Sequence, residues 1–223
     1  MAPAPIVFNA YGTLFDPASI GTALEDRFPG DGARLVTLWR ATQLRHTWLR
    51  SLMGAFLDFD SVTRQALAQV LDDAGLAADD ALIEDLAGRW RTLPPYPDVV
   101  LALDALEADR PLAILTNGRQ WTVEAAVRAA GLAERIPVVL SVEAVGVYKP
   151  VPIVYRLAAR HFQRPLDAIW FVSGNAWDCA GAAAAGLRVI RLRRDASGAE
   201  PIAEPPTATI DDLGALPSVV RGS

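Results

Sequence analysis

Five short and almost uninterrupted apolar runs constrain the fold of this 223-residue chain more than any other feature of its sequence. Alanine- and leucine-rich stretches of helical character accompany four of them, and strands that alternate with helices indicate a parallel sheet. Strands without polar alternation are typical of a sheet that is covered on both faces. The pattern therefore predicts an α/β fold with a doubly wound parallel sheet. The runs span residues 5–8, 111–115, 136–140, 168–172 and 187–192.

The stretch between the first and second runs breaks this alternation, because it contains no convincing strand. Its leucines and tryptophans favour helices instead. The simplest arrangement is a helical cap domain, residues 17–95, inserted into a core domain made of residues 1–16 and 96–223. The helices are expected over residues 32–53, 62–71 and 81–93.

The composition argues against several classes of protein. With 21 Lys and Arg against 26 Asp and Glu, the net charge is −5 and no basic block stands out, so nucleic acid is not an expected partner. The single cysteine, Cys179, excludes an internal disulfide. No uncharged stretch reaches the roughly 20 residues of a membrane helix, and no signal peptide is recognisable. We therefore expect a cytoplasmic protein without a membrane partner, and a surface tail after Asp195.

Polar side chains gather where the predicted strands end. Ligands of open parallel sheets bind at the carboxyl ends of the strands, so the residues that follow the runs are candidate site residues. Taken singly, each has an ordinary interpretation as a turn former, helix cap or solvated loop residue. Only the ordered set indicates a site. It comprises Asn9, Tyr11, Thr13, Thr116, Asn117, Lys149, Ser173, Asn175 and Asp178.

Four segments that carry these residues occur in the order found in the haloacid dehalogenase superfamily, and they most resemble its L-2-haloacid dehalogenases. The segments are VFNAYGTL (7–14), LTNG (115–118), VYKP (147–150) and FVSGNAWD (171–178). Residues 38–40, 47–54 and 58–59 also resemble the cap of that family. The resemblance covers nearly the whole chain. It implies a Rossmann-like core with an inserted helical cap, and an active site between the two.

The resemblance also implies a reaction, the hydrolysis of short 2-haloalkanoic acids to 2-hydroxy acids with inversion at C2. In the family, an aspartate displaces the halide and water hydrolyses the resulting ester, with no cofactor or metal. Similar enzymes are often homodimers, and the composition is compatible with a homodimer here. The implied catalytic residues are Asn9, Thr13, Lys149, Ser173, Asn175 and Asp178. The implied substrate-binding residues are Tyr11, Arg40, Leu44, Phe59, Thr116, Asn117, Tyr155 and Trp177, of which Arg40, Asn117 and Trp177 would surround the departing halide.

Position 9 departs from the family, because asparagine stands where family members have the nucleophilic aspartate. A carboxamide has nearly the same shape but is neutral and a poor nucleophile, so we expect substrate binding with little or no turnover. Two interpretations are open: a deliberate Asp-to-Asn change that traps substrate, and a natural member that lost catalysis. We favour the first, because Arg40, Lys149 and Asp178 are all retained.

Two other functions fit parts of the pattern. Phosphatases of the superfamily hold Mg²⁺ with an Asp-x-Asp motif at the first strand, but Tyr11 cannot supply the second acid. A non-catalytic protein that binds small carboxylates is the second alternative, and a native Asn9 would favour it. We expect no metal site from His46 and His161, which lie far apart in the sequence.

Overall fold

A six-stranded sheet forms the centre of the computed structural model, which describes residues 3–106, 110–194, 198 and 200–221. The strand order is β3-β2-β1-β4-β5-β6, and every pairing is parallel. This arrangement confirms the predicted Rossmann-like, doubly wound fold, and each of the five apolar runs forms a strand. The strands are β1 (Ile6–Phe8), β2 (Leu112–Thr116), β3 (Val138–Ser141), β4 (Trp170–Ser173), β5 (Arg188–Leu192) and β6 (Ala208–Ile210).

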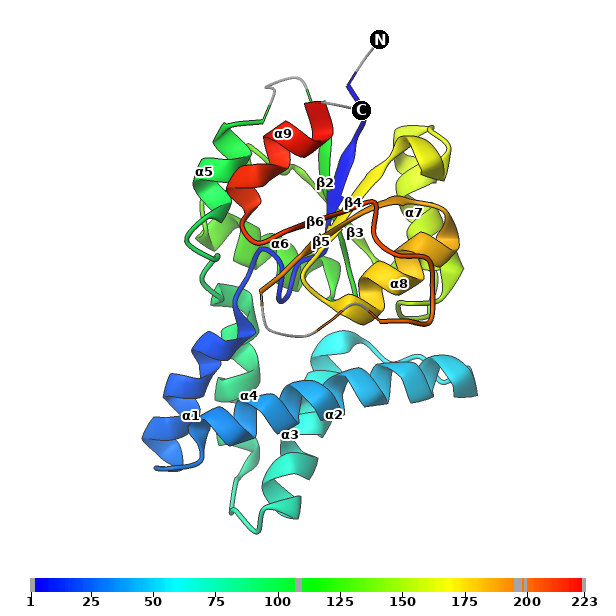
Figure 1. The fold of residues 1–223 in the computed structure, drawn as a ribbon. Coiled ribbons are helices and arrows are strands. Elements are labelled where there is room, and N and C mark those ends of the chain that lie inside the picture. Colours follow the sequence, from blue (N-terminus) through cyan, green and yellow to red (C-terminus); the bar gives the residue numbers. More distant parts are fainter. Residues whose placement is uncertain (1–2, 107–109, 195–197, 199, 222–223) are drawn as a thin grey trace.

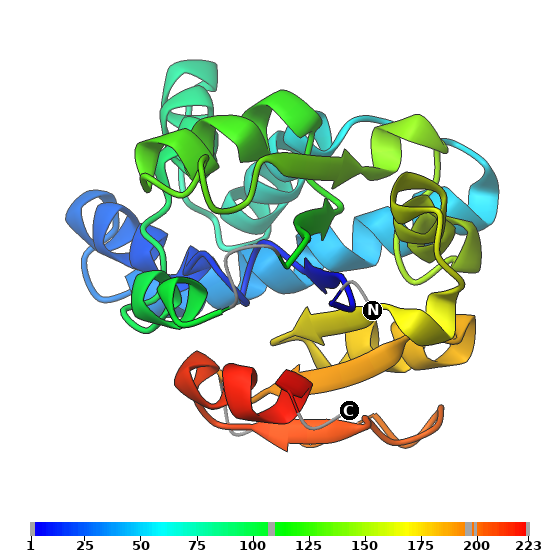
Figure 2. The ribbon, with the colours of Figure 1, turned by 90° about the horizontal axis from the view of Figure 1, so that it is seen from above.

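Helices cover both faces of the sheet, which explains why the strands are apolar throughout. Helices α7 and α8 lie on one face, and α5 and α9 lie on the other (Figure 2). The central strand β1 is completely buried, with Val7 paired to Ala113 on one side and Phe171 on the other. These helices are α5 (Val99–Asp104), α7 (Pro152–Phe162), α8 (Ala176–Ala185) and α9 (Leu216–Arg221), while α6 (Gln120–Ala129) packs beside β3.

Helices α1 to α4, in the first part of the segment between β1 and β2, form a separate helical layer (Figure 1). Two stretches of chain join this layer to the sheet, and they run side by side: Asp16 N–H donates to Pro94 O at 3.0 Å, and Tyr96 N–H donates to Leu14 O at 2.9 Å. The layer consists of α1 (Gly21–Arg27), α2 (Gly32–Met53), α3 (Phe59–Asp73), α4 (Asp80–Gly88) and the 3₁₀ helix η2 (Arg89–Thr92).

The prediction of a surface tail after Asp195 is wrong for most of that segment. Residues 208–210 add β6 to the edge of the sheet, and Leu213, Leu216 and Val220 are buried against the core. Pro201, Pro205 and Pro206 precede the strand, and a strand of three residues is too short for a recognisable period. Residues 195–197 and 199, where the expected tail begins, lie outside the described residues.

Candidate active site

One small pocket lies between the carboxyl ends of the strands and helix α2. Its volume is about 10 Å³, which is the room that a single water molecule needs. Eight of the fourteen candidate residues line it, so the fold brings together segments more than a hundred residues apart. The lining residues are Asn9, Tyr11, Arg40, Leu44, Phe59, Asn117, Asn175 and Trp177.

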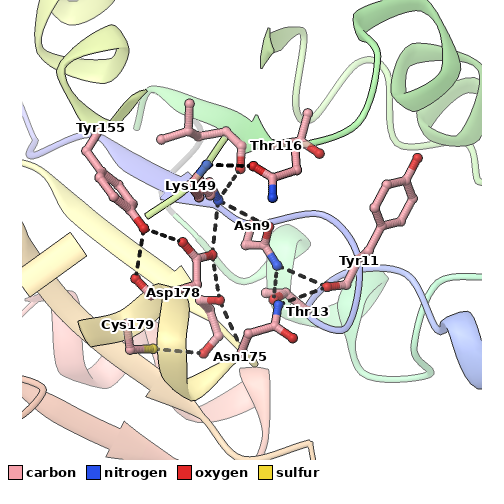
Figure 3. A network of polar contacts seen from close by, with 12 residues as sticks. Asn9, Tyr11, Thr13, Thr116, Lys149, Tyr155, Asn175, Asp178 and Cys179 are labelled. Carbon is pink, nitrogen blue, oxygen red and sulfur yellow. Dashed lines mark hydrogen bonds and ion pairs between the residues drawn. The ribbon is translucent and has the colours of Figure 1, made fainter. Parts of the chain in front are cut away.

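Behind the pocket, Lys149 joins position 9 to Asp178 (Figure 3). Its Nζ lies 2.7 Å from Leu115 O, 3.0 Å from Asp178 Oδ2 and 3.2 Å from Asn9 Oδ1. The side chain is completely buried. Burial lowers the pKa of Lys149, and the charge of Asp178 opposes that shift without cancelling it. Lys149 is thus a buried cation whose counter-charge is built into the protein.

Asp178 is held from several sides at the start of α8. The Tyr155 hydroxyl donates to Asp178 Oδ1 at 2.7 Å, and the Ser173 hydroxyl donates to Oδ2 at 3.0 Å. Each of these three side chains is completely buried. Tyr155 and Ser173 therefore do not line the pocket: they contact the carboxylate from behind and fix its orientation.

The Asn9 amide is satisfied at both ends. Its oxygen accepts from Lys149, and its Nδ2 donates to Tyr11 O at 3.0 Å and to Thr13 Oγ1 at 3.1 Å. Thr13 Oγ1 also accepts from the Gly174 N–H at 2.8 Å, so it connects the loop after β1 to the loop after β4. An aspartate at position 9 would place a carboxylate oxygen where the Nδ2 of Asn9 donates to the Tyr11 carbonyl. Because two acceptors cannot form a hydrogen bond, the aspartate would need different partners from those of Asn9.

Thr116 occupies a more local position than the resemblance implies. Its hydroxyl accepts from the Gly118 N–H at 2.9 Å, within its own turn, and the side chain is completely buried. Thr116 does not line the pocket. It contributes by shaping the turn that carries the neighbouring residue Asn117.

Arg40 reaches the pocket from the opposite side, on helix α2. Its Nη1 donates to Gln43 Oε1 at 2.7 Å, and the guanidinium carbon lies 5.5 Å from the centre of the Trp90 ring. Among the described residues, no carboxylate lies within ion-pairing distance of Arg40. Burial, which removes water from the guanidinium, lowers the pKa of Arg40 to about 10, so the group is still a cation at neutral pH. It is a partly buried positive charge without a counter-ion.

Asn117, which lines the same pocket, adds a further donor. The Asn117 Oδ1 accepts from the Lys149 backbone N–H at 3.0 Å, which turns the Asn117 Nδ2 away, and this buried amide nitrogen has no partner. The buried Tyr11 hydroxyl also lacks a partner. Burial raises the pKa of Tyr11 well above its usual range, so the hydroxyl stays protonated. A cation and one unpartnered amide nitrogen among the lining residues make the pocket complementary to an anion.

Aromatic rings form the apolar wall of the pocket. Tyr11 stacks on Phe59 with ring centres 5.9 Å apart, and Trp90 packs edge-on against Tyr11 at 4.7 Å. On the other side, Trp177 meets Trp48 edge-on at 5.6 Å. Sequence reasoning missed Trp90 and Trp48 as neighbours of the site, because nothing in their own segments distinguishes them from ordinary packing residues.

Two wider grooves flank the closed pocket. One, of about 650 Å³, meets it at Arg40, Leu44 and Asn175. The other, of about 640 Å³, meets it at Trp177 and is lined mainly by apolar side chains such as Leu52 and Pro150. The pocket therefore shares lining side chains with both grooves.

Other residues considered from the sequence lie outside this pocket. His46 contacts Gln69 Oε1 at 2.9 Å and His161 packs on Phe162, while Cys179 is buried, which raises the pKa of its thiol to about 12. Within the described ranges, no three His, Cys, Asp or Glu side chains gather as metal ligands would. No helix there is both long enough and apolar enough to cross a membrane.

Comparison with known proteins agrees with this fold. Residues 6–186 match the family described as haloacid dehalogenase-like hydrolase. The chain is 38% identical, over an alignment of 240 positions, to the (S)-2-haloacid dehalogenase of Xanthobacter autotrophicus, with 97% of this chain and 94% of the relative covered. It is 37% identical over 212 residues to the (S)-2-haloacid dehalogenase H-109 of Pseudomonas putida, with 95% of each covered.

A solved structure gives the same result. The L-2-haloacid dehalogenase from Xanthobacter autotrophicus, with chloropropionic acid covalently bound, superposes with a TM-score of 0.94 at 37% identity, covering 99% of both chains. The chain thus belongs to the haloacid dehalogenase superfamily and, within it, to the family of L-2-haloacid dehalogenases. This confirms the family predicted from the four motifs.

Proposed function

We propose that this chain is an (S)-2-haloacid dehalogenase in which Asn9 replaces the nucleophile, so that it binds short 2-haloalkanoic acids and turns over little or none of them. The observation that carries the proposal is a pair of groups that line one pocket with Asn9: the Arg40 guanidinium, which has no carboxylate partner among the described residues, and the Asn117 Nδ2, which has no hydrogen-bond partner. The covalently bound chloropropionic acid of the Xanthobacter relative supports the same substrate class.

With an aspartate at position 9, the first step would be displacement of the halide. The carboxylate attacks C2 from the strand side, the bond to the halogen breaks on the opposite side, and the centre inverts. Arg40, the Asn117 amide and the edge of Trp177 stabilise the charge that develops on the leaving halide. The aromatic wall excludes bulk water from C2 and strengthens these contacts.

The second step would be hydrolysis of the aspartyl ester. We assign the activation of water to Asp178 acting with Lys149, which lies between Asp178 and position 9. Thr13 and Ser173 hold the surrounding loops, and Asn175, which lines the pocket, contacts the substrate carboxylate. With an aspartate at position 9, Lys149 would lie between two carboxylates and offset the cost of burying the nucleophile, while Arg40 would offset the cost of burying the anionic substrate.

Asp178→Asn, made together with Asn9→Asp, tests the assignment of the water. The amide cannot accept the proton of the attacking water, so we expect the ester to accumulate. Intact-protein mass spectrometry after mixing with 2-chloropropionate would show it as added mass. The Asn9→Asp protein alone, which should return to its starting mass, is the control. Normal turnover by the double variant would remove Asp178 from this role.

The division into domains is also part of the proposal. Residues 17–95 act as a cap over a core of residues 1–16 and 96–223, with the active site between them. The pocket has room for about one water molecule. Side chains of its wall must therefore move apart before a three-carbon acid can bind. The groove that meets the pocket at Arg40, Leu44 and Asn175 is the proposed route, because it presents a cation to an anionic substrate.

The decisive experiment is Asn9→Asp. We expect this variant to release halide from 2-chloropropionate or a haloacetate, measured with a halide-specific assay, while the Asn9 protein releases little or none. Asn9→Ser, which offers neither a carboxylate nor an amide, is the matched control, and circular dichroism checks folding. Failure of the folded Asn9→Asp protein to exceed the Asn9 protein would overturn the proposal.

The same protein distinguishes the alternatives. Mg²⁺-dependent hydrolysis of p-nitrophenyl phosphate by the Asn9→Asp variant would identify a phosphatase. Binding of 2-haloacids by both proteins without halide release by either would identify a non-catalytic protein that binds small carboxylates. A homodimer and a cytoplasmic location are further parts of the proposal, the first of which sedimentation would test.

A further inference from the structure

A buried polar chain connects Arg40 to the inside of the helical layer. Gln43, one turn after Arg40 on α2, is 0% exposed, and its partner Thr63 on α3 is 2% exposed. Arg40 Nη1 donates to Gln43 Oε1 at 2.7 Å, and Gln43 Nε2 donates to Thr63 Oγ1 at 2.6 Å. Neither Gln43 nor Thr63 belongs to the motifs that identified the site, and neither lines the pocket.

The hydrogen bonds of Thr63 determine which way the Gln43 amide faces. The Thr63 hydroxyl donates its only hydrogen to Phe59 O at 2.7 Å, so towards Gln43 it can only accept. Gln43 must therefore present its NH₂ group to Thr63 and its carbonyl oxygen to Arg40. The Trp39 indole donates to Thr63 O at 2.8 Å and fixes the backbone at that point. The acceptor offered to Arg40 is thus set by a chain of three bonds.

The chemistry of that acceptor matters, because Gln43 is neutral. A carboxylate at the same place would form an ion pair with Arg40 and would neutralise the charge that faces the pocket. An amide oxygen orients the guanidinium while leaving its net charge intact. The other contact, the Trp90 ring at 5.5 Å, is also uncharged. Lys149, by contrast, is paired with Asp178 at 3.0 Å.

We propose that Gln43 is a positioning residue for Arg40: its amide, oriented by Thr63, aims the guanidinium at the pocket and leaves its positive charge free for the halide. The inference rests on the proposed function, since it requires Arg40 to contact the leaving halide. It adds that the neutrality of residue 43 is what keeps Arg40 competent to bind an anion.

The first test measures halide binding by the Asn9 protein, where no turnover intervenes. Titration with bromide, followed by calorimetry, should show binding that Gln43→Glu weakens roughly tenfold or more, because the new carboxylate would pair with Arg40 and compete with bromide for its charge. Thr63→Val, which removes the anchoring hydroxyl, should weaken bromide binding several-fold, about the effect of one ordinary hydrogen bond. Thr63→Ser, which keeps the hydroxyl, should restore it.

The chain offers a matched control on the same pair of helices. Arg50 Nη2 donates to Gln65 Oε1 at 2.9 Å, an exposed Arg–Gln pair that also joins α2 to α3. Gln65→Glu makes the same chemical change beside an arginine, away from the pocket. It should leave bromide affinity unchanged. If Gln65→Glu weakened bromide binding as much as Gln43→Glu, the effect would be one of overall charge and the inference would fail.

The second test uses the Asn9→Asp protein and separates positioning from folding. Charge develops on the halide mainly in the transition state, so Gln43→Glu should lower kcat roughly tenfold or more while KM changes less. A merely structural role would lower the melting temperature without this split. Unchanged bromide affinity and kcat in folded Gln43→Glu would overturn the inference.

Arg40→Met distinguishes this failure from failure of the proposed function. If Arg40→Met abolishes bromide binding and Gln43→Glu does not, only the role of Gln43 is lost. If the parent protein binds no bromide and Asn9→Asp releases no halide, the proposed function fails and the inference fails with it.

Discussion

Two cations face position 9 from opposite sides, and the protein holds them in opposite ways. Lys149, on the strand side, is completely buried and makes an ion pair with Asp178 at 3.0 Å. Arg40, on the helical side, has a neutral amide and an aromatic ring for neighbours. The charge of Lys149 is committed within the protein, whereas that of Arg40 is open to an anion from solution. One side of the pocket is thus built for stability and the other for binding.

The largest expected effects come from removing each cation in turn. Lys149→Met leaves the buried Asp178 carboxylate without its counter-charge, so we expect the free energy of unfolding to fall by about 3–5 kcal/mol. Arg40→Met breaks no ion pair, and the removal of a partly desolvated charge offsets the lost bond to Gln43, so its cost should be about 1 kcal/mol or less. Urea unfolding of both variants measures the difference. Equal losses of stability would contradict the comparison.

A second prediction concerns backbone packing on the two sides. A Cβ atom at Gly174, in the loop after β4, would lie 1.9 Å from the Gly12 carbonyl oxygen, so the two loops would have to move apart. We expect Gly174→Ala to cost about 1–3 kcal/mol in the free energy of unfolding. The helical layer provides the control: a Cβ at Gly88 meets nothing within 4 Å, and Gly88→Ala should stabilise by roughly 0.5–1 kcal/mol.

Gly174 also shows why a small residue occurs at this position in the motif. Its N–H donates to Thr13 Oγ1, and the loop after β1 packs directly against it. If Gly174→Ala retained full stability, the loops after β1 and β4 would be able to move apart at no cost. The strand side of the pocket would then not be the rigid side of the comparison. Thermal unfolding of the two glycine variants in one buffer would decide this.

The smallest expected effects are opposite pH dependences of two acids. Burial by itself would raise the pKa of Asp98, but hydrogen bonds from Arg194 and from the Leu213 N–H outweigh it and lower that pKa. A lowered pKa gives stability that is present above the unfolded value of about 4 and is lost as the pH falls through the folded value. Asp98→Asn should therefore lose about 1–2 kcal/mol at neutral pH, and the loss should shrink in acid.

Asp60, where α3 contacts Thr122 of the core, should behave in the opposite way. Burial raises the pKa of Asp60, and the 2.8 Å bond from the Thr122 hydroxyl only partly opposes the shift. A raised pKa means that stability falls as the pH rises through the folded value. Asp60→Asn should flatten this slope. Unfolding curves of the two Asn variants from pH 3 to 7 would contradict the comparison if their slopes relative to the parent had the same sign.

The fold was largely readable from the sequence, because apolar runs that alternate with helical stretches are a local signal. Strands β1 to β5 and the long helix α2 all follow from it. Strand β6 was missed since three residues after several prolines carry no period, and only pairing with β5 gives them a structure. The site was readable at the level of segments, since its residues follow the strand ends in the motif order.

The arrangement within the site was not readable from the sequence. Nothing local shows that Tyr155, Ser173 and Thr116 lie behind the pocket while Tyr11 and Trp177 line it. The partners of Gln43 and Trp90 were equally hidden. The contact of Gln43 with Thr63 and that of Trp90 with Tyr11 join side chains 20 or more residues apart, and such contacts depend on how distant segments pack against one another.

The sequence by itself determined the parallel sheet, the family and the asparagine at position 9, because each can be recognised from short contiguous stretches of residues. The tertiary structure decided the state of the charges around that asparagine. It buried Lys149 beside Asp178 and left Arg40 beside a neutral amide, and the physical reason is that burial and pairing depend on neighbours from distant segments. An anionic chain of net charge −5 thereby acquires a pocket that is complementary to an anion.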